Sequence, residues 1–528
     1  MNRRIRTAAA ALAAALTVLA AVPGTASAAP GDPDPAFGTA GRSVLNVGAS
    51  GGTLGDVAVQ PDGKIVAVGH VVTGIGPDAL VVRLRPDGSP DPTFGDLGAV
   101  KLNNGFGEVG EAVALQPDGK ILVAGHLTST TVDAALWRLN PDGSRDTGFG
   151  DQGLVSLDYK VDEGLAGVAV QGDGKIVAVG RIGTSSRSGM AAFRFTAQGK
   201  PDPAFGGGGG GLTQIPSSSG YSAASTLDLQ RDGKILVGGY NGDRQALTVY
   251  RLTTAGTLDP DFGEGKSGLV FVPGTGPIAF DVRAMPDGTV VALGHHVVKG
   301  TAEPYLARFS SSGGLDPSYG GGVPLPTTVL HSLALDRAGR VVASGGVGTF
   351  GTQGSGGVVT RFNAAGHLDT GFGRGGVTLT ASEPGSFGIG TAVQPNGAVV
   401  TVGNDGGTPL NPMVVRVTGD PAPGSPPPPP PPASVPACQG RPATVVGTPG
   451  DDRLAGTPGA DVIVGLDGDD KISARGGNDL VCAGDGDDKV VGGGGKDVLR
   501  GEAGDDRLAG GSGRDRLVGG PGRDRVRQ

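Results

Sequence analysis

Hydrophobic and polar residues alternate in short runs along the first four fifths of the chain, and the runs come in pairs around a tight turn. In the clearest pair, residues 57–69, Val-Ala-Val and Ile-Val-Ala-Val flank Gln-Pro-Asp-Gly-Lys. Such alternation predicts half-buried β-strands, and the glycine of Pro-Asp-Gly takes the positive φ that reverses the chain. The sixth copy departs most, since Asp-Arg-Ala-Gly replaces Pro-Asp-Gly at residues 336–339. The pattern predicts seven hairpins, with turn glycines Gly63, Gly119, Gly174, Gly233, Gly288, Gly339 and Gly397.

Two further signatures recur seven times in the same order. One is a strand in which an arginine precedes an apolar residue, at Arg83, Arg138, Arg194, Arg251, Arg308, Arg361 and Arg416. The other is an Asp-Pro-x-Phe-Gly corner with the aromatic residues Phe37, Phe94, Phe149, Phe205, Phe262, Tyr319 and Phe372. The arginines could clamp a substrate, but one per unit is typical of a scaffold contact. We expect each to pair with an aspartate of a neighbouring corner or turn, as Arg83 with Asp91 or Asp62, and each aromatic residue to pack between units.

A short β-type stretch follows each corner, so every unit of about 56 residues contains four strands. Consecutive four-stranded units of this length are typical of a β-propeller, here with seven blades. The chain opens on a corner and a fourth strand, so we expect residues 44–47 to pair with the last blade and close the ring. Residues 32–418 resemble the delta-60 repeat family, whose units carry the same Gln-Pro-Asp-Gly-Lys and Asp-Pro-x-Phe-Gly elements. The resemblance implies a propeller fold and says little about function.

A strict nine-residue period runs for nine copies over residues 447–527. Its fourth position is always glycine, and its eighth is always a branched apolar residue. Its sixth position is always aspartate: Asp452, Asp461, Asp470, Asp479, Asp488, Asp497, Asp506, Asp515 and Asp524. The period resembles the calcium-binding nonapeptide of the RTX (haemolysin-type) family. The resemblance implies a parallel β-roll, an RTX solenoid, that binds Ca²⁺ through these aspartates.

Two nonapeptides complete one coil of such a roll, so copies i and i+2 stack about 4.8 Å apart. Stacked carboxylates at this distance repel by roughly 3 kcal/mol per pair at an effective dielectric constant near 20. Ca²⁺ between the coils relieves the repulsion and is coordinated by aspartate oxygens and turn carbonyls. Nine copies leave seven gaps, so we expect several ions, at most about seven, and a roll that is largely unfolded without them. A metal-free glycine-rich solenoid is the alternative, but its period would not demand the aspartate.

The N-terminal residues resemble a targeting segment. Arg3, Arg4 and Arg6 precede an apolar run over residues 8–22, and Ala-Ser-Ala at residues 26–28 supplies a small-residue cleavage pattern. This arrangement is typical of a secretory signal peptide, which predicts a secreted, extracellular protein. No later run approaches about 18 consecutive apolar residues, so we expect no membrane span.

The two cysteines are then expected in an oxidising compartment. A disulfide between Cys438 and Cys482 would close a loop of about 45 residues and add about 4 kcal/mol in the chain-entropy model. It would pin the open N-terminal end of the roll, which lacks a preceding coil. Two free thiols are the alternative.

Glycine and proline make up 102 and 40 of the 528 residues, which without a period is typical of disorder. Here the repeats assign most glycines to turns, and a run of seven prolines marks an extended linker. The net charge of −8 argues against a nucleic-acid partner held by phosphate contacts. The expected organisation is all-β: signal peptide 1–28, propeller 31–419, proline-rich linker 420–437 and roll 438–528.

The propeller offers one candidate ligand site. On the face opposite the Pro-Asp-Gly turns, the residues that follow the second strand's glycine would form a polar ring around the channel mouth: His70, His126, Arg181, Tyr240 and His295. This ring would hold a polar or anionic ligand, or its members simply begin exposed loops. No His-Glu-x-x-His or P-loop motif occurs, and acidic residues are too plentiful for paired carboxylates to indicate an enzyme.

These features predict a secreted calcium-binding protein with a structural or adhesive role. Its propeller would be a recognition or scaffold module for an extracellular glycan or protein ligand. The alternative function is an extracellular propeller enzyme, a glycosidase or lyase, with the roll as a stabilising accessory domain.

Overall fold

The computed structural model describes most of residues 28–528, in two compact units that lie within residues 28–427 and 428–528. It leaves out residues 1–27, 48–50, 75, 129–130, 185–186, 216–220, 243–245, 277, 299–300, 324, 326–327, 348–355, 381–386, 421–436, 440 and 449. The predicted signal peptide and proline-rich linker fall almost entirely outside the described residues. Both, with the predicted domain boundaries, stay predictions.

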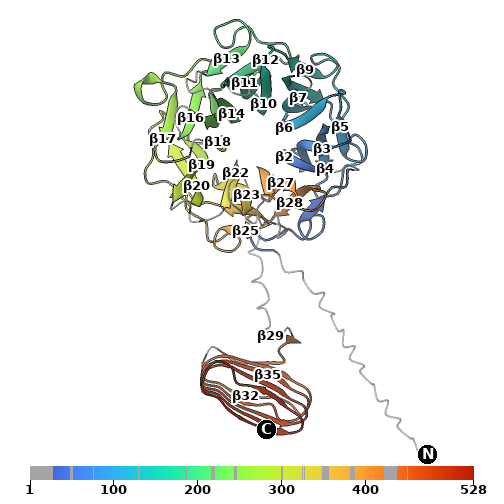
Figure 1. The fold of residues 1–528 in the computed structure, drawn as a ribbon, viewed down its shortest axis with the longest axis vertical. Helices are drawn as coiled ribbons and strands as arrows, with labels where there is room; N and C mark the ends of the chain where they lie inside the picture. The colour runs from blue at the N-terminus through green and yellow to red at the C-terminus, as the bar shows by residue number, and fades with distance from the viewer. Residues whose placement is uncertain are drawn as a thin grey trace, which may run out of the picture. The chain divides into compact units, whose positions relative to one another are not determined.

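The N-terminal unit is a ring of seven four-stranded antiparallel sheets, so the predicted seven-bladed propeller is confirmed (Figure 1). The first three blades contain β2 (Gly52–Val59), β3 (Ile65–Val72), β4 (Pro77–Leu84), β5 (Ala99–Leu102); β6 (Gly107–Leu115), β7 (Ile121–Thr128), β8 (Val132–Leu139), β9 (Leu154–Leu157); β10 (Asp162–Val170), β11 (Ile176–Thr184), β12 (Arg187–Phe195) and β13 (Leu212–Ile215). The next three contain β14 (Ser222–Leu229), β15 (Ile235–Asn241), β16 (Leu247–Leu252), β17 (Leu269–Val272); β18 (Asp281–Ala284), β19 (Val290–Val298), β20 (Thr301–Phe309), β21 (Gly321–Gly322); β22 (Thr328–Leu335), β23 (Val341–Val347), β24 (Gly356–Arg361) and β25 (Val377–Leu379).

The seventh blade joins the two ends of the propeller. It consists of β26 (Phe387–Val393), β27 (Val399–Asn404), β28 (Pro412–Val417) and the first strand of the chain, β1 (Arg42–Val44). The predicted closure is therefore present, but β1 begins two residues before the expected stretch 44–47. Arg416 Nε donates to Asp34 Oδ2 at 2.8 Å, so a corner aspartate also ties the two ends together.

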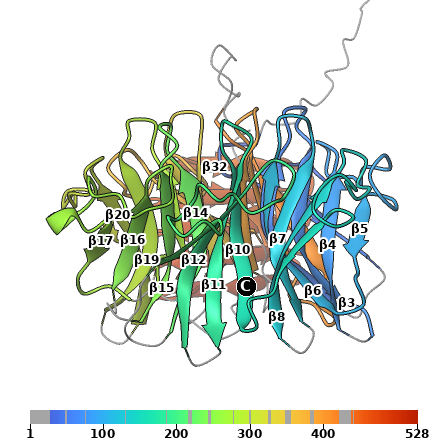
Figure 2. The ribbon, with the colours of Figure 1, turned by 90° about the horizontal axis from the view of Figure 1, so that it is seen from above.

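The blades stand side by side around the ring (Figure 2), with β2, β6, β10, β14, β18 and β22 nearest its centre (Figure 1). The hairpin of the sixth blade forms although its turn lacks proline, because Asp336 Oδ1 accepts the backbone N–H groups of Ala338 and Arg340, each at 2.9 Å. The described residues contain a single 3₁₀ turn, η1 (Glu264–Lys266), and no helix long and apolar enough to cross a membrane.

The arginine that recurs in every repeat unit contacts a corner aspartate, a corner aromatic ring and the chain of a neighbouring blade, as Arg83 illustrates. Arg83 Nε donates to Asp91 Oδ2 at 2.8 Å, and its guanidinium lies 4.6 Å from the centroid of the Phe94 ring. Arg83 also donates to the carbonyl of Pro141 in the next blade, and Phe94 packs in a core cluster shared by both blades. The other six pairs are Arg138–Asp146, Arg194–Asp202, Arg251–Asp259, Arg308–Asp316, Arg361–Asp369 and Arg416–Asp34.

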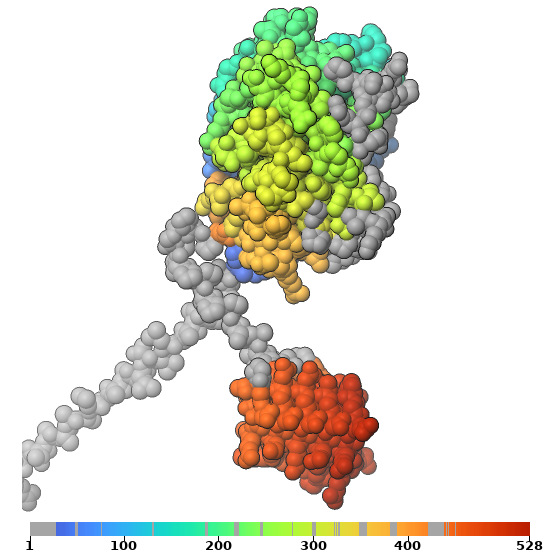
Figure 3. Space-filling view, turned by 90° about the vertical axis from the view of Figure 1, so that its left-hand side faces the viewer, coloured from blue at the N-terminus to red at the C-terminus, as the bar shows by residue number. Residues whose placement is uncertain are grey.

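The C-terminal unit is a parallel β-solenoid, as predicted, in which alternate strands form two sheets. One sheet contains β31 (Val445–Val446), β33 (Val462–Asp467), β35 (Leu480–Asp485), β37 (Val498–Ala503) and β39 (Arg516–Val518). The other contains β32 (Arg453–Ala455), β34 (Lys471–Ser473), β36 (Lys489–Gly494), β38 (Arg507–Ser512) and β40 (Arg525–Arg527). Each strand pairs with the strand 18 residues further on, for example Ile463 with Val481. The eighth-position side chains fill the core between the sheets, and successive coils appear as regular rows in Figure 3.

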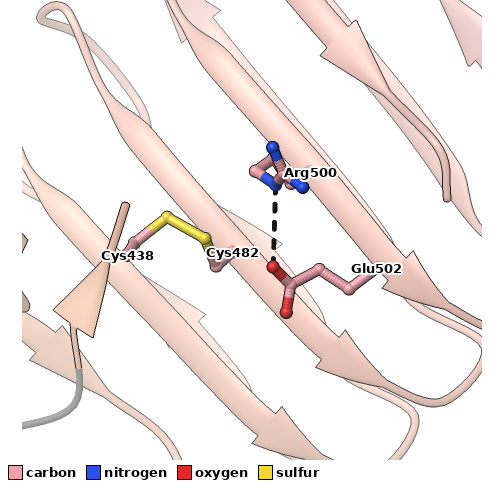
Figure 4. The surroundings of a disulfide bond; sticks show 4 residues. All are labelled: Cys438, Cys482, Arg500 and Glu502. Carbon is pink, nitrogen blue, oxygen red and sulfur yellow. Dashed lines mark ion pairs between the residues drawn. A yellow bond between two sulfur atoms is a disulfide. The ribbon is translucent and has the colours of Figure 1, made fainter. Parts of the chain in front are cut away.

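A disulfide attaches a short hairpin to the outside of the roll. The hairpin strands are β29 (Ala437–Cys438) and β30 (Arg441–Pro442), and Cys438 is bonded to Cys482 of β35 with their Cα atoms 5.7 Å apart (Figure 4). Cys438 is fully buried against Val462, Val464 and Leu480. The hairpin therefore covers the outer face of the first sheet, where the seventh and ninth positions are largely apolar.

The substitution Arg83→Ala should destabilise the propeller by about 3–5 kcal/mol, because it leaves the buried Asp91 carboxylate without its nearest positive partner. Chemical denaturation of the full chain measures this effect. Arg85→Ala is the matched control, since Arg85 is exposed two residues away and should cost less than about 0.5 kcal/mol. Equal stabilities of the two variants would contradict a scaffold role for the arginine.

Candidate metal centre

From the third copy onward, the backbone of the roll has a positive φ at the fourth position of each copy. Gly468, Gly486 and Gly504 have φ values of 112°, 136° and 137°, which side chains disfavour. A Cβ at Gly468 would also lie 2.5 Å from the carbonyl carbon of Gly450 in the preceding coil. From the third copy onward the fourth-position glycine is thus required twice, by its positive φ and by the close approach of the coils.

This turn presents the sixth-position aspartate to the neighbouring coil. Oδ1 of each aspartate from Asp470 onward accepts the backbone N–H of the aspartate 18 residues earlier, at distances of 2.8–3.2 Å. The side chains in the middle of the roll are almost completely buried, with Asp506 0 % exposed and Asp488 1 % exposed. One oxygen of each carboxylate is therefore held in place by the fold.

The other oxygen has no partner within the described residues. In six consecutive copies Oδ2 is buried and accepts no hydrogen bond, in Asp470, Asp479, Asp488, Asp497, Asp506 and Asp515. A buried carboxylate oxygen without a donor or a positive charge costs several kcal/mol. The fold thus leaves one repeated, unmet requirement for positive charge.

Backbone carbonyl oxygens lie near the unpartnered Oδ2 atoms of the aspartates. A Cβ on Gly465 would lie 2.3 Å from Asp470 Oδ2 and 2.1 Å from the carbonyl oxygen of Ala483. The corresponding distances are 2.5 and 2.6 Å at Gly492, and 2.0 and 2.6 Å at Gly501. The first-position glycine therefore leaves room for a small group between an ionised oxygen and a carbonyl oxygen, which are the donors that Ca²⁺ prefers at about 2.3–2.6 Å.

The nine copies are not equivalent. In the first two copies a threonine donates through its N–H and its hydroxyl to Oδ2, at 2.5 and 2.9 Å from Thr448 to Asp452 and at 2.6 and 2.9 Å from Thr457 to Asp461. In the fourth and fifth copies the first position is Ala474 or Ala483, so a methyl group stands where the other copies have only hydrogen. Copies 3, 6 and 7 alone combine a free Oδ2, a first-position glycine and a carbonyl from two copies later.

The pKa shifts distinguish aspartates with a free Oδ2 from Asp461, whose Oδ2 accepts the threonine hydrogen bonds. Burial raises the pKa of Asp488 to about 7, and the neighbouring charges of Asp506 and Asp470 act in the same direction. Burial also raises the pKa values of Asp470, Asp479, Asp497 and Asp506. The pKa of Asp461 is lowered instead, chiefly by the backbone N–H of Thr457.

The described residues contain no group of three His, Cys, Asp or Glu side chains able to hold an ion together. An ion in the roll would depend on one or two carboxylates with backbone carbonyls, as the sequence predicted. The donor set of the roll fits Ca²⁺. The sequence analysis treated all nine copies as equivalent calcium sites and missed the difference between them. Threonine at the second position and alanine at the first position were the signals that could have shown it.

The predicted polar ring of the propeller lies within strands. His70, His126, Arg181, Tyr240 and His295 belong to β3, β7, β11, β15 and β19, which continue beyond the glycines before any loop begins. The first three side chains are neighbours: burial, Arg181 and His70 together lower the pKa of His126. His295 packs against Phe280 with ring centroids 5.7 Å apart. Their role as a ligand ring stays a prediction.

A different set of residues lines the centre of the propeller. A β-bulge in six of the innermost strands displaces the residue eight positions before the turn glycine, and Phe280 has the same offset in the fifth blade. We call these seven residues the bulge ring: Gly55, Glu111, Ala166, Ser225, Phe280, His331 and Ile389. All seven line one cavity of about 610 Å³. Their constant offset from the turn places them at equivalent positions of the seven blades.

The carboxylates of this cavity are mostly engaged by the scaffold. Asp56 accepts the N–H groups of Val57 and of Val113 in the next blade, at 2.8 and 2.9 Å, although burial raises its pKa to about 6. Asp228 accepts the N–H groups of Leu229 and Ala284 in the same way. Glu111 differs, because its side chain is 43 % exposed and its Oε1 lies 3.9 Å from Nδ1 of His126.

Comparison with protein families supports the assignment of the propeller repeat and of the calcium-binding nonapeptide repeat. Residues 60–94, 116–149, 171–205 and 230–262 match a domain of unknown function (DUF5122) beta-propeller, and residues 446–481, 483–517 and 491–526 match the RTX calcium-binding nonapeptide repeat. The chain carries both repeats. The four DUF5122 matches are the units whose turn ends in lysine, and in each of them that lysine pairs with the corner aspartate.

No curated protein matches the chain. Among solved structures, catalytically inactive virginiamycin B lyase from Staphylococcus aureus with quinupristin is 12 % identical, covering 71 % of this chain and 98 % of its own, with a TM-score of 0.43. A protein of unknown function from Dyadobacter fermentans is 14 % identical, covering 73 % and 100 %, with a TM-score of 0.38. Hydrazine synthase from Kuenenia stuttgartiensis is 12 % identical, covering 71 % and 98 %, with a TM-score of 0.43.

The substitution Asp506→Asn should weaken calcium binding by the full chain, with one ion lost or bound on the order of tenfold more weakly. Asparagine keeps the Oδ1 acceptor for Asp488 N–H but removes the charge of the unpartnered oxygen. Isothermal titration with CaCl₂ measures both quantities. Asp452→Asn is the matched control and should change them less, since Thr448 already satisfies Oδ2 of Asp452. A larger loss in the control would contradict the ranking of the copies.

Proposed function

We propose that this protein is a secreted calcium-binding protein whose β-roll is completed by several Ca²⁺ ions, with the propeller as a recognition or scaffold module. Its role would be structural or adhesive, at the cell surface or in the extracellular medium. The observation that carries the proposal is the row of six buried, unpartnered carboxylate oxygens in the roll. The match to RTX calcium-binding repeats over the same residues supports it.

The copies predict where the ions bind. Asp470, Asp497 and Asp506 would hold the principal ions, because copies 3, 6 and 7 combine the free carboxylate oxygen, the glycine and the carbonyl. Threonine hydrogen bonds compete for Asp452 and Asp461, and alanine methyl groups narrow the spots beside Asp479 and Asp488. Among the described residues, no carbonyl is one of the three atoms nearest a Cβ built on the first-position glycine beside Asp515 or Asp524. The number of tightly bound ions should therefore fall below the seven gaps between coils.

Secretion is supported by two features of the chain and is consistent with the proposed role of Ca²⁺. The N-terminal residues have the pattern of a signal peptide. The Cys438–Cys482 disulfide suits an oxidising compartment. A roll that depends on Ca²⁺ also needs a medium in which the ion is abundant. Together these features favour an extracellular location.

A binding role for the propeller is supported by Asp56 and Asp228, whose carboxylates accept backbone N–H groups and so serve the scaffold. The cavity adds aromatic groups suited to a polar ligand such as a glycan, with the Tyr221 and Tyr240 rings 5.7 Å apart and those of Phe280 and His331 5.5 Å apart. An enzyme, a glycosidase or lyase, is the second candidate, because burial raises the pKa of the accessible Glu111. A glycan array read together with released-product analysis separates the two: retention without cleavage favours the module.

Thermal unfolding of the full chain should show two transitions, of which only that of the roll responds to calcium. Ions that bind the folded roll at 100 times their dissociation constant stabilise it by about 2.7 kcal/mol per site. The far-UV circular dichroism signal of the roll should be largely lost in calcium-free buffer, and magnesium serves as the control ion. A roll transition that is the same with and without calcium would overturn the proposal.

A further inference from the structure

The roll carries a column of positive charge on one sheet. In the sheet β32–β34–β36–β38–β40 the seventh position of every coil is basic, and we call these five residues the basic ladder: Arg453, Lys471, Lys489, Arg507 and Arg525. They stand directly opposite one another in the parallel register. Adjacent members are therefore one strand spacing apart, about 4.8 Å.

The face of the basic ladder is bare. All five side chains are exposed, and none of them lies within 4.0 Å of a carboxylate oxygen of the described residues. The ninth position beside the ladder is small in most coils, with Ala455, Ser473 and Ala509. The basic ladder therefore runs beside a row of small side chains. An extended polymer could lie along this row without steric hindrance.

The opposite sheet is built differently. Its seventh positions are Val462, Leu480, Val498 and Arg516, and the disulfide-linked hairpin covers its apolar part. One outer face of the solenoid is thus closed by the chain itself, whereas the other is left open and charged. A solvated face would not require charge of one sign, yet no acidic residue occupies positions seven to nine of any copy.

Like charges directly opposite each other destabilise a sheet. The five basic side chains therefore repel one another, and none of them forms an ion pair within the described residues that would offset this repulsion. Bound Ca²⁺ would make the electrostatic potential around the basic ladder more positive. Residues 438–528 contain 13 Lys and Arg against 16 Asp and Glu, a net charge of −3. Each Ca²⁺ adds two positive charges, so two bound ions make the roll positive overall.

We propose that the basic ladder binds a linear anionic polysaccharide in a calcium-dependent way. A sugar ring with its glycosidic oxygen spans a length comparable to one strand spacing, so a polymer with a carboxylate or sulfate on successive sugars presents anions at a matching interval. A polysaccharide is favoured over a nucleic acid because the five strands carry no aromatic side chain for base stacking. The calcium dependence rests on the proposed function of the roll.

Fluorescence anisotropy of the full chain with labelled oligosaccharides tests the proposal. The probes are short oligogalacturonates, which carry carboxylates, and chondroitin sulfate oligosaccharides of the same length, which also carry sulfates. At least one probe should bind in calcium and lose at least about tenfold in affinity without it. The triple variant K471Q/K489Q/R507Q should lose about tenfold or more, whereas K471R/K489R, which keeps the charges, should bind as the unchanged chain does.

The matched control is R441Q/R500Q/R516Q, which removes three positive charges from the hairpin and the opposite sheet. It should bind within about twofold of the unchanged chain. An equal loss in both triple variants, or no binding of either probe, would overturn the proposal. A single-stranded oligonucleotide that binds as tightly as the sugars would overturn the assignment to polysaccharide. Calcium titration of each variant distinguishes these failures from failure of the calcium site itself.

Discussion

Buried aspartates recur in both units of this chain, and a carboxylate taken out of water needs a positive partner or several hydrogen bonds. In the propeller the partner is part of the protein. Burial of Asp91 opposes its ionisation, but hydrogen bonds from Thr93 and the charges of Arg83 and Lys64 lower its pKa to about 2. In the roll no arginine or lysine reaches the equivalent oxygen, and the pKa of Asp488 rises to about 7. The carboxylates of the propeller find their partners within the protein, whereas the proposed function has the roll completed by an added cation.

This difference in how the carboxylates are neutralised separates the propeller from the roll. Seven Arg–Asp–aromatic contacts tie each blade to the next, so the propeller is a rigid frame in which the bulge ring varies freely in chemistry. The roll has a small core of one branched side chain per nonapeptide, and its two long edges are lined with carboxylates. Under the proposed function its stability would be coupled to calcium concentration, and so would the electrostatic field around the basic ladder.

Much of this architecture follows from repetition in the sequence. The hairpin turns, the Arg83–Asp91 pair, the 18-residue stacking of the roll and the Cys438–Cys482 disulfide were predictable, because each depends on local turn chemistry or on a fixed period. The bulge ring was not, since which residue a bulge displaces depends on the register between two strands. The ligand ring was expected at the start of loops, but Tyr240 and His295 lie in strands that extend past their glycines. The differences between copies of the nonapeptide arise from neighbours such as Thr448 and Ala483, which the shared motif does not include.

Hydrogen exchange of the full chain, resolved by mass spectrometry into peptides of each unit, tests the dependence of the roll on an external cation most directly. Backbone amides of residues 462–518 should exchange on the order of a hundredfold more slowly when calcium is added, while those of the propeller strands stay unchanged. Equal protection of residues 462–518 in calcium-free buffer would contradict the account, because it would mean that the buried carboxylates are stabilised by the protein alone.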